Sequence, residues 1–423
     1  MTYRFIKDLI AYNIKFGSGF EKELKTILGL SNLPKQELLE LKEKTFVKQF
    51  QNAFQNSKFY NNLYQSHGLS IHSVKSLSDA NKLPIINKTI VKENALAILT
   101  RPRFTVFKAY SSGTTGTPLR VYRNFSSTIK EYAYGHFFQQ MHGYQLGDPV
   151  VSLRGVLDRN TLSYFDKSNN VLYISSFHLG TDKLAEIHKM ITDFQPKVIK
   201  AYPSSMHILA TELYKANLEL NIPLAFTSSE VLHDFQREII EKVFHTKIFD
   251  WYGNAEQTVA FGQFADSYYH EFPLYSHTEF EDNHMITTGF INRVFPLIRY
   301  KVDDVIQLAP TSNGTCVVQK IEGRDDDYVI LKNGQQIGRL DLAFKKVNRL
   351  LAAQIIQNVV GEIKVNLIPD KGFTVLDNTQ LEQNLRALLG NDCSIKFEKI
   401  ETQELIRSSK GKFSLVVSQI EKI

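Results

Sequence analysis

Short runs of β-branched and aromatic residues alternate with amphipathic helical stretches through the middle of the chain. The runs include DPVVSL, NVLYIS, PKVIKAY, PLAFTSS and TKIFDWY, and the helical stretches include TDKLAEIHKMITDF, SSMHILATELYKANL and HDFQREIIEKVF. Alternating strands and helices predict an α/β core with a largely parallel sheet. Ligands of such sheets bind at the carboxyl ends of the strands, so the loops that follow the strands are the candidate sites.

The two ends of the chain carry other patterns. Residues 21–66 predict helices, with Pro34 dividing two of them, and residues 284–309 read as consecutive β segments. Towards the carboxyl end, LDLAFKKVNRLL and TQLEQNLRALLG predict helices, set among the strands IKVNLIP, SIKFEKI and FSLVVSQI. A charged, turn-rich junction, IEGRDDDYVILKNG, separates this last region from the rest.

These patterns predict a large N-terminal α/β domain with mixed sheets and a small C-terminal α+β domain. We place the first over residues 1–323, with a helical leader over about 1–80, and the second over residues 324–423.

Composition narrows the function classes. The 423 residues carry a net charge of +6, which would help retain anionic small molecules but is too mild to indicate a nucleic-acid partner. The only cysteines, Cys316 and Cys393, exclude a disulfide framework and Cys-rich metal motifs. No stretch approaches the roughly 20 apolar residues of a membrane span, so we expect a cytoplasmic protein.

The segment AYSSGTTGTP, residues 109–118, is the strongest chemical signal. Gly113 and Gly116 allow successive backbone N–H groups to point into one concavity, and threonine hydroxyls add donors, so the loop suits a polyphosphate. The residues alone also allow a polar hairpin loop. A Walker A loop is excluded because no Gly-Lys-Ser/Thr follows.

This loop resembles the Ser-Gly-Thr-Thr-Gly-x-Pro phosphate loop of the adenylate-forming superfamily, and further blocks follow in that family's order. They are DWYGNAEQ at 250–257, FPLIRYKVDDVI at 295–306, IEGRDDDYVIL at 321–331 and SKGKF at 409–413. The SSE at 228–230 and the YPSSM at 202–206 are most similar to the phenylacetate–CoA ligase branch, and within it to CapK-type capsular polysaccharide proteins. The resemblance covers roughly residues 80–415.

The resemblance implies a nucleotide site and a magnesium site. The residues expected to bind ATP or AMP are Ser111, Ser112, Gly113, Thr114, Thr115, Gly116, Thr117, Ser228, Ser229, Glu230, Asp250, Trp251, Tyr252, Gly253, Asp304 and Arg324. Tyr252 would stack on adenine and Asp304 would accept from the ribose hydroxyls. Glu256 would supply the carboxylate for Mg²⁺, a cation that takes hard oxygen ligands and keeps several waters. Core packing of Tyr252 and Trp251, and ordinary surface positions for the charged residues, are the alternatives.

The resemblance also implies a mobile C-terminal domain that carries the catalytic lysine. Lys412 would stabilise the bridging oxygen and the α-phosphate, Lys410 is its rival, and Asp326 matches the hinge. The acid pocket of this branch would involve Tyr202, Pro203 and Ser204.

The chain departs from the family's pattern at three positions. Leu119 follows the loop's proline where lysine is frequent, Ala255 precedes Glu256 where threonine is usual, and Asp303 replaces the glycine before Asp304. These departures weaken the expected phosphate geometry without removing Glu256, Asp304 or Lys412.

The expected activity is ATP- and Mg²⁺-dependent adenylation of a small carboxylic acid, followed by acyl transfer. The acceptor is open between coenzyme A, an amine or hydroxyl of a sugar, and a carrier acting in trans. The alternative is a nucleotide-binding subunit of a polysaccharide-assembly complex that has lost catalysis, motivated by the three departures.

Overall fold

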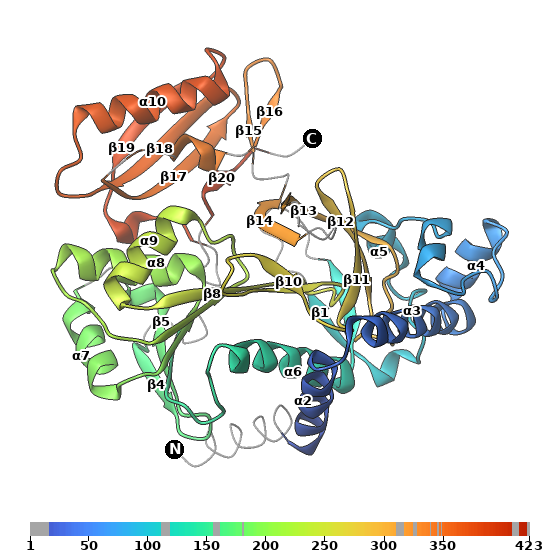
Figure 1. Ribbon diagram of the computed structural model, residues 1–423. Coiled ribbons are helices and arrows are strands. Elements are labelled where there is room, and N and C mark those ends of the chain that lie inside the picture. Colours follow the sequence, from blue (N-terminus) through green and yellow to red (C-terminus); the bar gives the residue numbers. More distant parts are fainter. Residues whose placement is uncertain are drawn as a thin grey trace. The chain divides into compact units, whose positions relative to one another are not determined.

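The chain divides into two compact units, each made of two separate segments. The computed structural model describes residues 17–110, 119–154, 161–179, 182–309, 317–324, 328–338, 340–344, 347, 349–407 and 414–420 (Figure 1). The first unit joins residues 1–145 to 249–321, and the second joins 146–248 to 322–423. No helix among the described residues is both long enough and apolar enough to cross a membrane.

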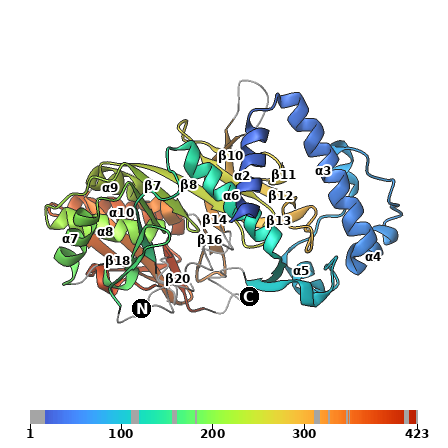
Figure 2. The same ribbon diagram turned by 90° about the horizontal axis from the view of Figure 1, so that it is seen from below.

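Helices form the start of the first unit, as the sequence predicts. Pro34 does divide two of them: α2 ends at Ser31 and α3 begins at Lys35, directly after this proline. The helices and short 3-10 turns are α2 (Ser18–Ser31), α3 (Lys35–Asn56), α4 (Lys58–Ser66), η1 (Leu77–Lys82), α5 (Lys88–Asn94), η2 (Arg103–Thr105) and α6 (Phe125–Met141). α2 lies alongside α6, where Phe20 meets His136 edge to face (Figure 2).

The strands of the first unit form a hairpin and a larger, mainly antiparallel sheet. The hairpin is β1 (Phe107–Tyr110) with β2 (Arg120–Arg123). The sheet has the order β11-β12-β13-β14-β10-β9-β8 within this unit. Its strands are β8 (Lys247–Gly253), β9 (Ala260–Gln263), β10 (Tyr269–Glu271), β11 (Ser276–Glu281), β12 (His284–Gly289), β13 (Tyr300–Ala309) and β14 (Val317–Arg324). This sheet accounts for the β segments expected over 284–309.

An aromatic core joins the helical leader to the sheet. Phe46 and Phe50 of α3 and Tyr60 and Tyr64 of α4 are fully buried in one cluster with apolar residues of β12, β13 and the segment between them. Tyr60 also accepts a hydrogen bond from the backbone N–H of Ile298 at 3.0 Å. The leader is therefore part of the core that supports the sheet.

The second unit contains the parallel sheet that the sequence predicts. β3 lies parallel to β5 and β6, β6 lies parallel to β7, and β4 pairs antiparallel to β5 at the edge. The elements are β3 (Val150–Arg154), β4 (Ser163–Asp166), β5 (Val171–Ser175), η3 (Ser176–His178), α7 (Leu184–Phe194), β6 (Val198–Ala201), α8 (Pro203–Lys215), β7 (Leu224–Ser228) and α9 (Asp234–Phe244). All three helices contribute buried side chains to the core of this sheet.

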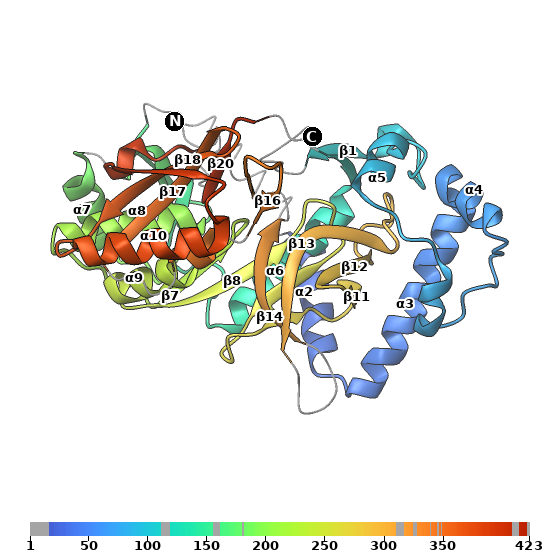
Figure 3. The same cartoon turned by 90° about the horizontal axis from the view of Figure 1, so that it is seen from above.

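The carboxyl-terminal segment of the second unit is an α+β arrangement. Four strands have the order β19-β18-β17-β20, and α10 lies along the sheet, burying Leu381, Leu385 and Leu389 (Figure 3). The elements are β15 (Val329–Ile330), β16 (Gln336–Ile337), η4 (Leu340–Phe344), β17 (Leu350–Val359), β18 (Glu362–Pro369), α10 (Val375–Leu389), β19 (Ser394–Lys399), η5 (Thr402–Glu404) and β20 (Val416–Ser418). A capping box of Thr374 and Asp377 begins α10.

The helix predicted from LDLAFKKVNRLL is wrong. Residues Leu340–Phe344 form a 3-10 turn, and a strand begins at Leu350 after Arg349, whose φ of 59° lies in the left-handed region. Antiparallel pairing of β17 with β18 overrides the helical spacing of Leu340, Phe344 and Leu351.

The C-terminal sheet shares a core with α8 and α9. Leu351 and Ala352 of β17 and Leu405 belong to the same buried cluster as Ile208 and Leu209 of α8. Polar contacts add to it, since the Lys215 ammonium donates to the Thr402 hydroxyl at 3.3 Å and that hydroxyl donates to Glu212. The compact units therefore group residues 322–423 with 146–248. The division into a domain of residues 1–323 and a mobile domain of residues 324–423 stays a prediction.

We predict that His207 makes the second unit acid-sensitive. Burial lowers the pKa of His207 from 6.5 to about 4, and its hydrogen bond to the backbone of Leu351 only partly opposes this. In the unfolded chain His207 takes up a proton near pH 6.5, whereas in the folded chain it stays neutral until about pH 4. The contribution of neutral His207 to the free energy of unfolding is therefore fully present above pH 6.5 and is lost as the pH falls towards 4. The loss should reach about 2 kcal/mol by pH 5.

The measurement is denaturant unfolding of the wild type and His207→Gln at pH 7.5 and pH 5. The variant should lose less stability on acidification than the wild type, and His72→Gln, at an exposed position, should match the wild type. Equal pH dependence in all three proteins would contradict the assignment to His207.

Candidate active site

The carboxyl end of β8 gathers several of the predicted nucleotide residues in the first unit. Asp250 is 4% exposed and accepts a hydrogen bond from the Tyr269 hydroxyl at 2.8 Å. Trp251 points the other way and stacks on Phe272, with ring centroids 4.8 Å apart. Gly253 ends the strand, where an added Cβ would lie 3.0 Å from the Trp251 indole nitrogen. Trp251 thus contributes to the core, while Asp250 is a buried carboxylate held by a phenol.

Tyr252 and Asp304 come together from blocks that lie far apart in the sequence. The Tyr252 hydroxyl donates to a carboxylate oxygen of Asp304 at 2.6 Å. Asp304 and Asp303 lie where β13 bulges, between the cross-strand pairs Met285–Val302 and His284–Val305. A bulge re-aims side chains out of the regular alternation. Asp303, the departure from glycine, has a half-exposed side chain 4.0 Å from the Lys88 ammonium.

Glu256 occupies the turn between β8 and β9. It is 8% exposed, and the Tyr300 hydroxyl donates to its carboxylate at 3.4 Å. Burial raises the pKa of Tyr300, and the nearby Glu256 raises it further, so this phenol keeps its proton. Tyr300 belongs to the RYKVDD block, but the sequence did not predict that its hydroxyl contacts Glu256; the structure shows this contact.

Glu256 could serve as one protein ligand of a magnesium ion, but the described residues around it do not form a complete set of metal ligands. Across the described part of the chain, no three His, Cys, Asp or Glu side chains are grouped so that they could hold a metal ion. A single buried carboxylate is compatible with Mg²⁺, since that cation binds through one or two carboxylates plus substrate phosphates and waters.

The second unit brings the SSE and YPSS blocks together. Ser228 ends β7, Ser229 has a φ of 71°, and Glu230 accepts a hydrogen bond from the backbone N–H of Ser204 at 3.1 Å. Ser204 lies in the first turn of α8, which Pro203 begins, so the carboxylate caps the positive end of this helix. Burial lowers the pKa of Arg407, and Glu230 lies close enough to oppose that shift.

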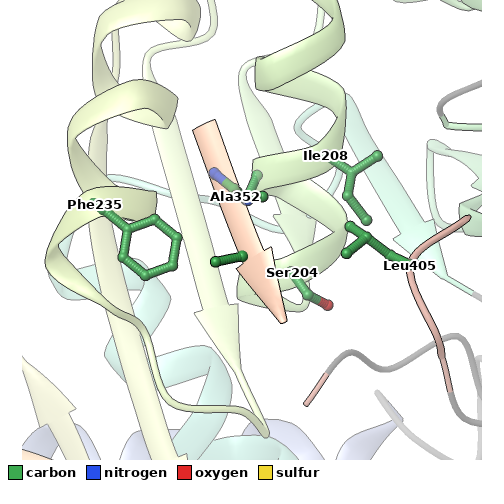
Figure 4. Close-up of a pocket in the computed structure, with 7 residues that line it drawn as sticks. Ser204, Ile208, Phe235, Ala352 and Leu405 are labelled. Atoms are coloured by element: carbon green, nitrogen blue, oxygen red, sulfur yellow. The ribbon is translucent and has the colours of Figure 1, made fainter. Parts of the chain in front are cut away.

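Ser204 lines a small cavity under β17. The cavity is bounded by Ser204, His207, Ile208, Phe235, Ala352, Ala353 and Leu405 (Figure 4). Its volume of about 10 Å³ is that of one water site, far below the size of a ligand pocket. The Ser204 side chain is therefore enclosed between α8 and β17, while Tyr202, at the helix N-cap, is partly exposed.

Several predicted residues lie outside what the structure describes. Residues 111–118, which contain Ser111 to Thr117, as well as Asp326, Lys410 and Lys412, fall outside the described residues. Arg324 is the last residue of β14, and its side chain is not described. Leu119, which replaces the frequent lysine, is fully buried in the core of the first unit. The strands on either side of 111–118 pair in register, Tyr110 with Arg120.

The chain is similar to known proteins both in sequence and in fold. The CapK C-terminal domain family matches residues 329–419. Protein CapK of Staphylococcus aureus is 25% identical, over 97% of this chain and 95% of its own length. A phenylacetate–coenzyme A ligase of Pseudomonas putida is 23% identical, over 85% of this chain and 89% of its own.

Solved structures show the fold. A 2-hydroxyisobutyryl-CoA ligase in its postadenylation state superposes with a TM-score of 0.68 and 17% identity, over 92% of this chain and 91% of that ligase. This agreement confirms the predicted fold class, a mixed α/β protein with a smaller C-terminal α+β part.

Proposed function

Because the chain belongs to the adenylate-forming superfamily and is CapK-like, we propose that it activates a carboxylic acid with ATP and transfers the acyl group to a nucleophile. The observation that carries this proposal is the double contact between two motif blocks, residues 250–257 and residues 295–306, within the first unit. The Tyr252 hydroxyl bonds Asp304, and Tyr300, from the same strand as Asp304, bonds Glu256. The contacts bring together an aromatic ring that could face adenine, a carboxylate that could accept from the ribose hydroxyls, and a carboxylate that could bind a phosphate-bound cation.

In the first half-reaction a carboxylate oxygen of the acid attacks the α-phosphorus of ATP. The bond to the β-phosphate oxygen breaks, which gives an acyl-adenylate and pyrophosphate. Two anions must approach each other, so their repulsion has to be offset by cations and oriented donors. Loop residues Ser111–Thr117 would donate to the phosphates, and Lys412, or its rival Lys410, would stabilise the attacking and bridging oxygens.

Nucleotide binding is assigned to the β8 and β13 residues. Asp304 would accept from the ribose hydroxyls while Tyr252 holds its carboxylate and offers a ring face to adenine. Asp250 of the same unit, and Ser228, Ser229, Glu230 and Arg324 of the second unit, are the further residues that we propose for nucleotide binding. Bound Mg²⁺ would neutralise phosphate charge, and Glu256 would hold it, with the Tyr300 hydroxyl fixing one carboxylate oxygen.

In the second half-reaction the acyl group passes from the adenylate to a nucleophile, releasing AMP. We propose that Asp326 is the hinge for a swing of the C-terminal domain, residues 324–423, between the half-reactions. The acid pocket would be built around Tyr202, Pro203 and Ser204. The acceptor is coenzyme A, as the names of the related ligases support, or an amino sugar in capsule or O-antigen synthesis, an acceptor that only the resemblance of the sequence motifs implies. Because the reaction consumes ATP, we place it in the cytoplasm.

A nucleotide-binding subunit without catalysis is the second candidate function. Leu119 favours it, because related sequences frequently carry a lysine there, and so do Ala255 and Asp303, the other two departures from the family pattern. Retention of Glu256 and Asp304 favours the enzyme.

The proposal predicts ATP–pyrophosphate exchange that depends on an added acid. The wild type, Lys412→Ala, Lys410→Ala and Glu256→Gln are compared with pooled carboxylic acids and excess Mg²⁺. Exchange should occur with at least one pool and fall by roughly a hundredfold or more in Lys412→Ala and Glu256→Gln, because each change removes charge stabilisation of the transition state. Exchange lost in Lys410→Ala but kept in Lys412→Ala would move the catalytic role to Lys410. ATP binding without exchange across all pools would favour the non-catalytic subunit.

A second prediction concerns the Tyr252–Asp304 pair. Tyr252→Phe keeps the aromatic ring and removes the hydroxyl that orients Asp304, so the KM for ATP should rise about tenfold, the value of one charge-assisted hydrogen bond. The KM for the acid should stay unchanged. Tyr134→Phe removes a buried hydroxyl that donates to the Pro273 carbonyl and serves as the control. An unaltered KM for ATP in Tyr252→Phe would contradict the assignment.

A further inference from the structure

The side chain of Arg123, at the end of β2, makes a set of contacts that no motif block predicts. Its Nε donates to the carbonyl oxygen of Ala255 at 3.2 Å, and its Nη2 donates to the same oxygen. Its Nη1 donates to a carboxylate oxygen of Glu131 on α6 at 2.7 Å. The Arg123 side chain, 16% exposed, therefore ties the residue before Glu256 to a neighbouring helix through its guanidinium.

The residue after Glu256 is tied to the same helix. The side-chain amide nitrogen of Gln257, Nε2, donates to the same carboxylate oxygen of Glu131 at 2.8 Å. It also donates to the backbone carbonyl of Ser127 at 3.3 Å. Gln257 is fully buried and its φ is 59°, so the turn holds a backbone shape that needs support. Its carbonyl is also closely packed, since an added Cβ on Gly289 would lie 2.6 Å from that oxygen. Both neighbours of Glu256 are thus anchored.

The positive charge of Arg123 also offsets the negative charge of the Glu131 carboxylate, which anchors both neighbours of Glu256. Burial raises the pKa of the Glu131 carboxyl, and Arg123 is the largest influence that opposes this rise. Removing the guanidinium would leave a partly buried carboxylate with only neutral donors, which favours its protonation or its displacement. A lysine has no planar fork and cannot reproduce donation to a carbonyl and a carboxylate in fixed directions.

Arg123 also lies close in sequence to the expected phosphate loop. It is in β2, whose partner β1 ends at Tyr110, so this hairpin flanks residues 111–118 on both sides. One side chain thus connects the hairpin of the phosphate loop to the turn of the proposed metal ligand.

We propose that Arg123 is a positioning residue which, through Ala255 and Glu131, fixes the turn that carries Glu256 and so sets the contribution of Mg²⁺ to ATP binding. This inference rests on the proposed function and adds to it a residue outside the motif blocks. Arg123 itself needs no contact with the nucleotide, because its donors are directed to Ala255 and Glu131.

The test measures the affinity for ATP with excess Mg²⁺ and again in EDTA, for the wild type, Arg123→Met, Arg123→Lys and Glu131→Gln. In the wild type Mg²⁺ should strengthen ATP binding. In Arg123→Met the Mg²⁺-dependent gain should shrink about tenfold or more, whereas the affinity in EDTA should stay within roughly twofold. Arg123→Lys should recover only part of the gain, and Glu131→Gln should lose less than Arg123→Met because it retains an acceptor oxygen.

Arg237→Met is the matched control. The Arg237 guanidinium also bridges a carboxylate, Glu241 at 3.0 Å, and a carbonyl, Ile248 at 2.9 Å, but it does so on α9. Its loss should alter stability without changing the Mg²⁺-dependent gain. Thermal unfolding of each variant reports folding, and if Arg123→Met does not fold, Arg123→Lys and Glu131→Gln decide the question by the same readout.

The outcomes separate the inference from the proposed function. A wild type whose ATP affinity does not depend on Mg²⁺ would contradict the proposed function, and the inference with it. A wild type that shows the gain, together with folded Arg123 variants that keep it in full, would overturn the inference alone. Equal loss of affinity in Mg²⁺ and in EDTA would also overturn it, because that result indicates a general structural role.

Discussion

As the proposed magnesium ligand, the carboxylate of Glu256 has to be held, nearly buried, in the turn between β8 and β9, and several elements of the first unit contribute contacts that hold this turn. A buried charge is tolerated only where its oxygens are satisfied and its backbone cannot relax. The Tyr300 hydroxyl contributes to the first condition by donating to one of the two oxygens, and the anchors on Ala255 and Gln257 provide the second. β8, β13, the β1–β2 hairpin and α6 must all be in place for these contacts, so the aromatic core that joins the helical leader to this sheet indirectly supports the position of Glu256.

The second unit shows a different kind of coupling. Glu230, expected to line the nucleotide site, caps the helix that begins with the expected acid-pocket residues. The same helix carries Ile208 and Leu209, which share a buried core with Leu351 and Leu405 of the C-terminal segment. A shift of the backbone at the start of α8 would therefore alter the contacts of both the SSE segment, residues 228–230, and β17. In the proposed cycle, this packing would link acid binding at the start of α8 to the position of the C-terminal segment.

Local patterns predicted what depends on neighbouring residues. The spacing of α7, α8 and α9 and the β-branched runs between them gave the parallel sheet, and Pro34 gave the division of the leader. The strand at Leu350 was missed because pairing with β18 decides it, and a helical period in the preceding residues masked it. The Arg123–Ala255 contact joins positions far apart in the chain, which no local signal reports. The motif blocks predicted Glu256 and Asp304, while the bulge that aims Asp304 and the hydroxyls of Tyr252 and Tyr300 required coordinates.

The most direct test of the account is a crystal structure of the full chain with Mg²⁺ and a non-hydrolysable ATP analogue. We predict a metal ion bound by a Glu256 carboxylate oxygen and by phosphate oxygens, ribose hydroxyls bonded to Asp304, and the adenine against the Tyr252 ring. Nucleotide bound away from β8 and β13, or bound there with no metal at Glu256, would contradict the central claim.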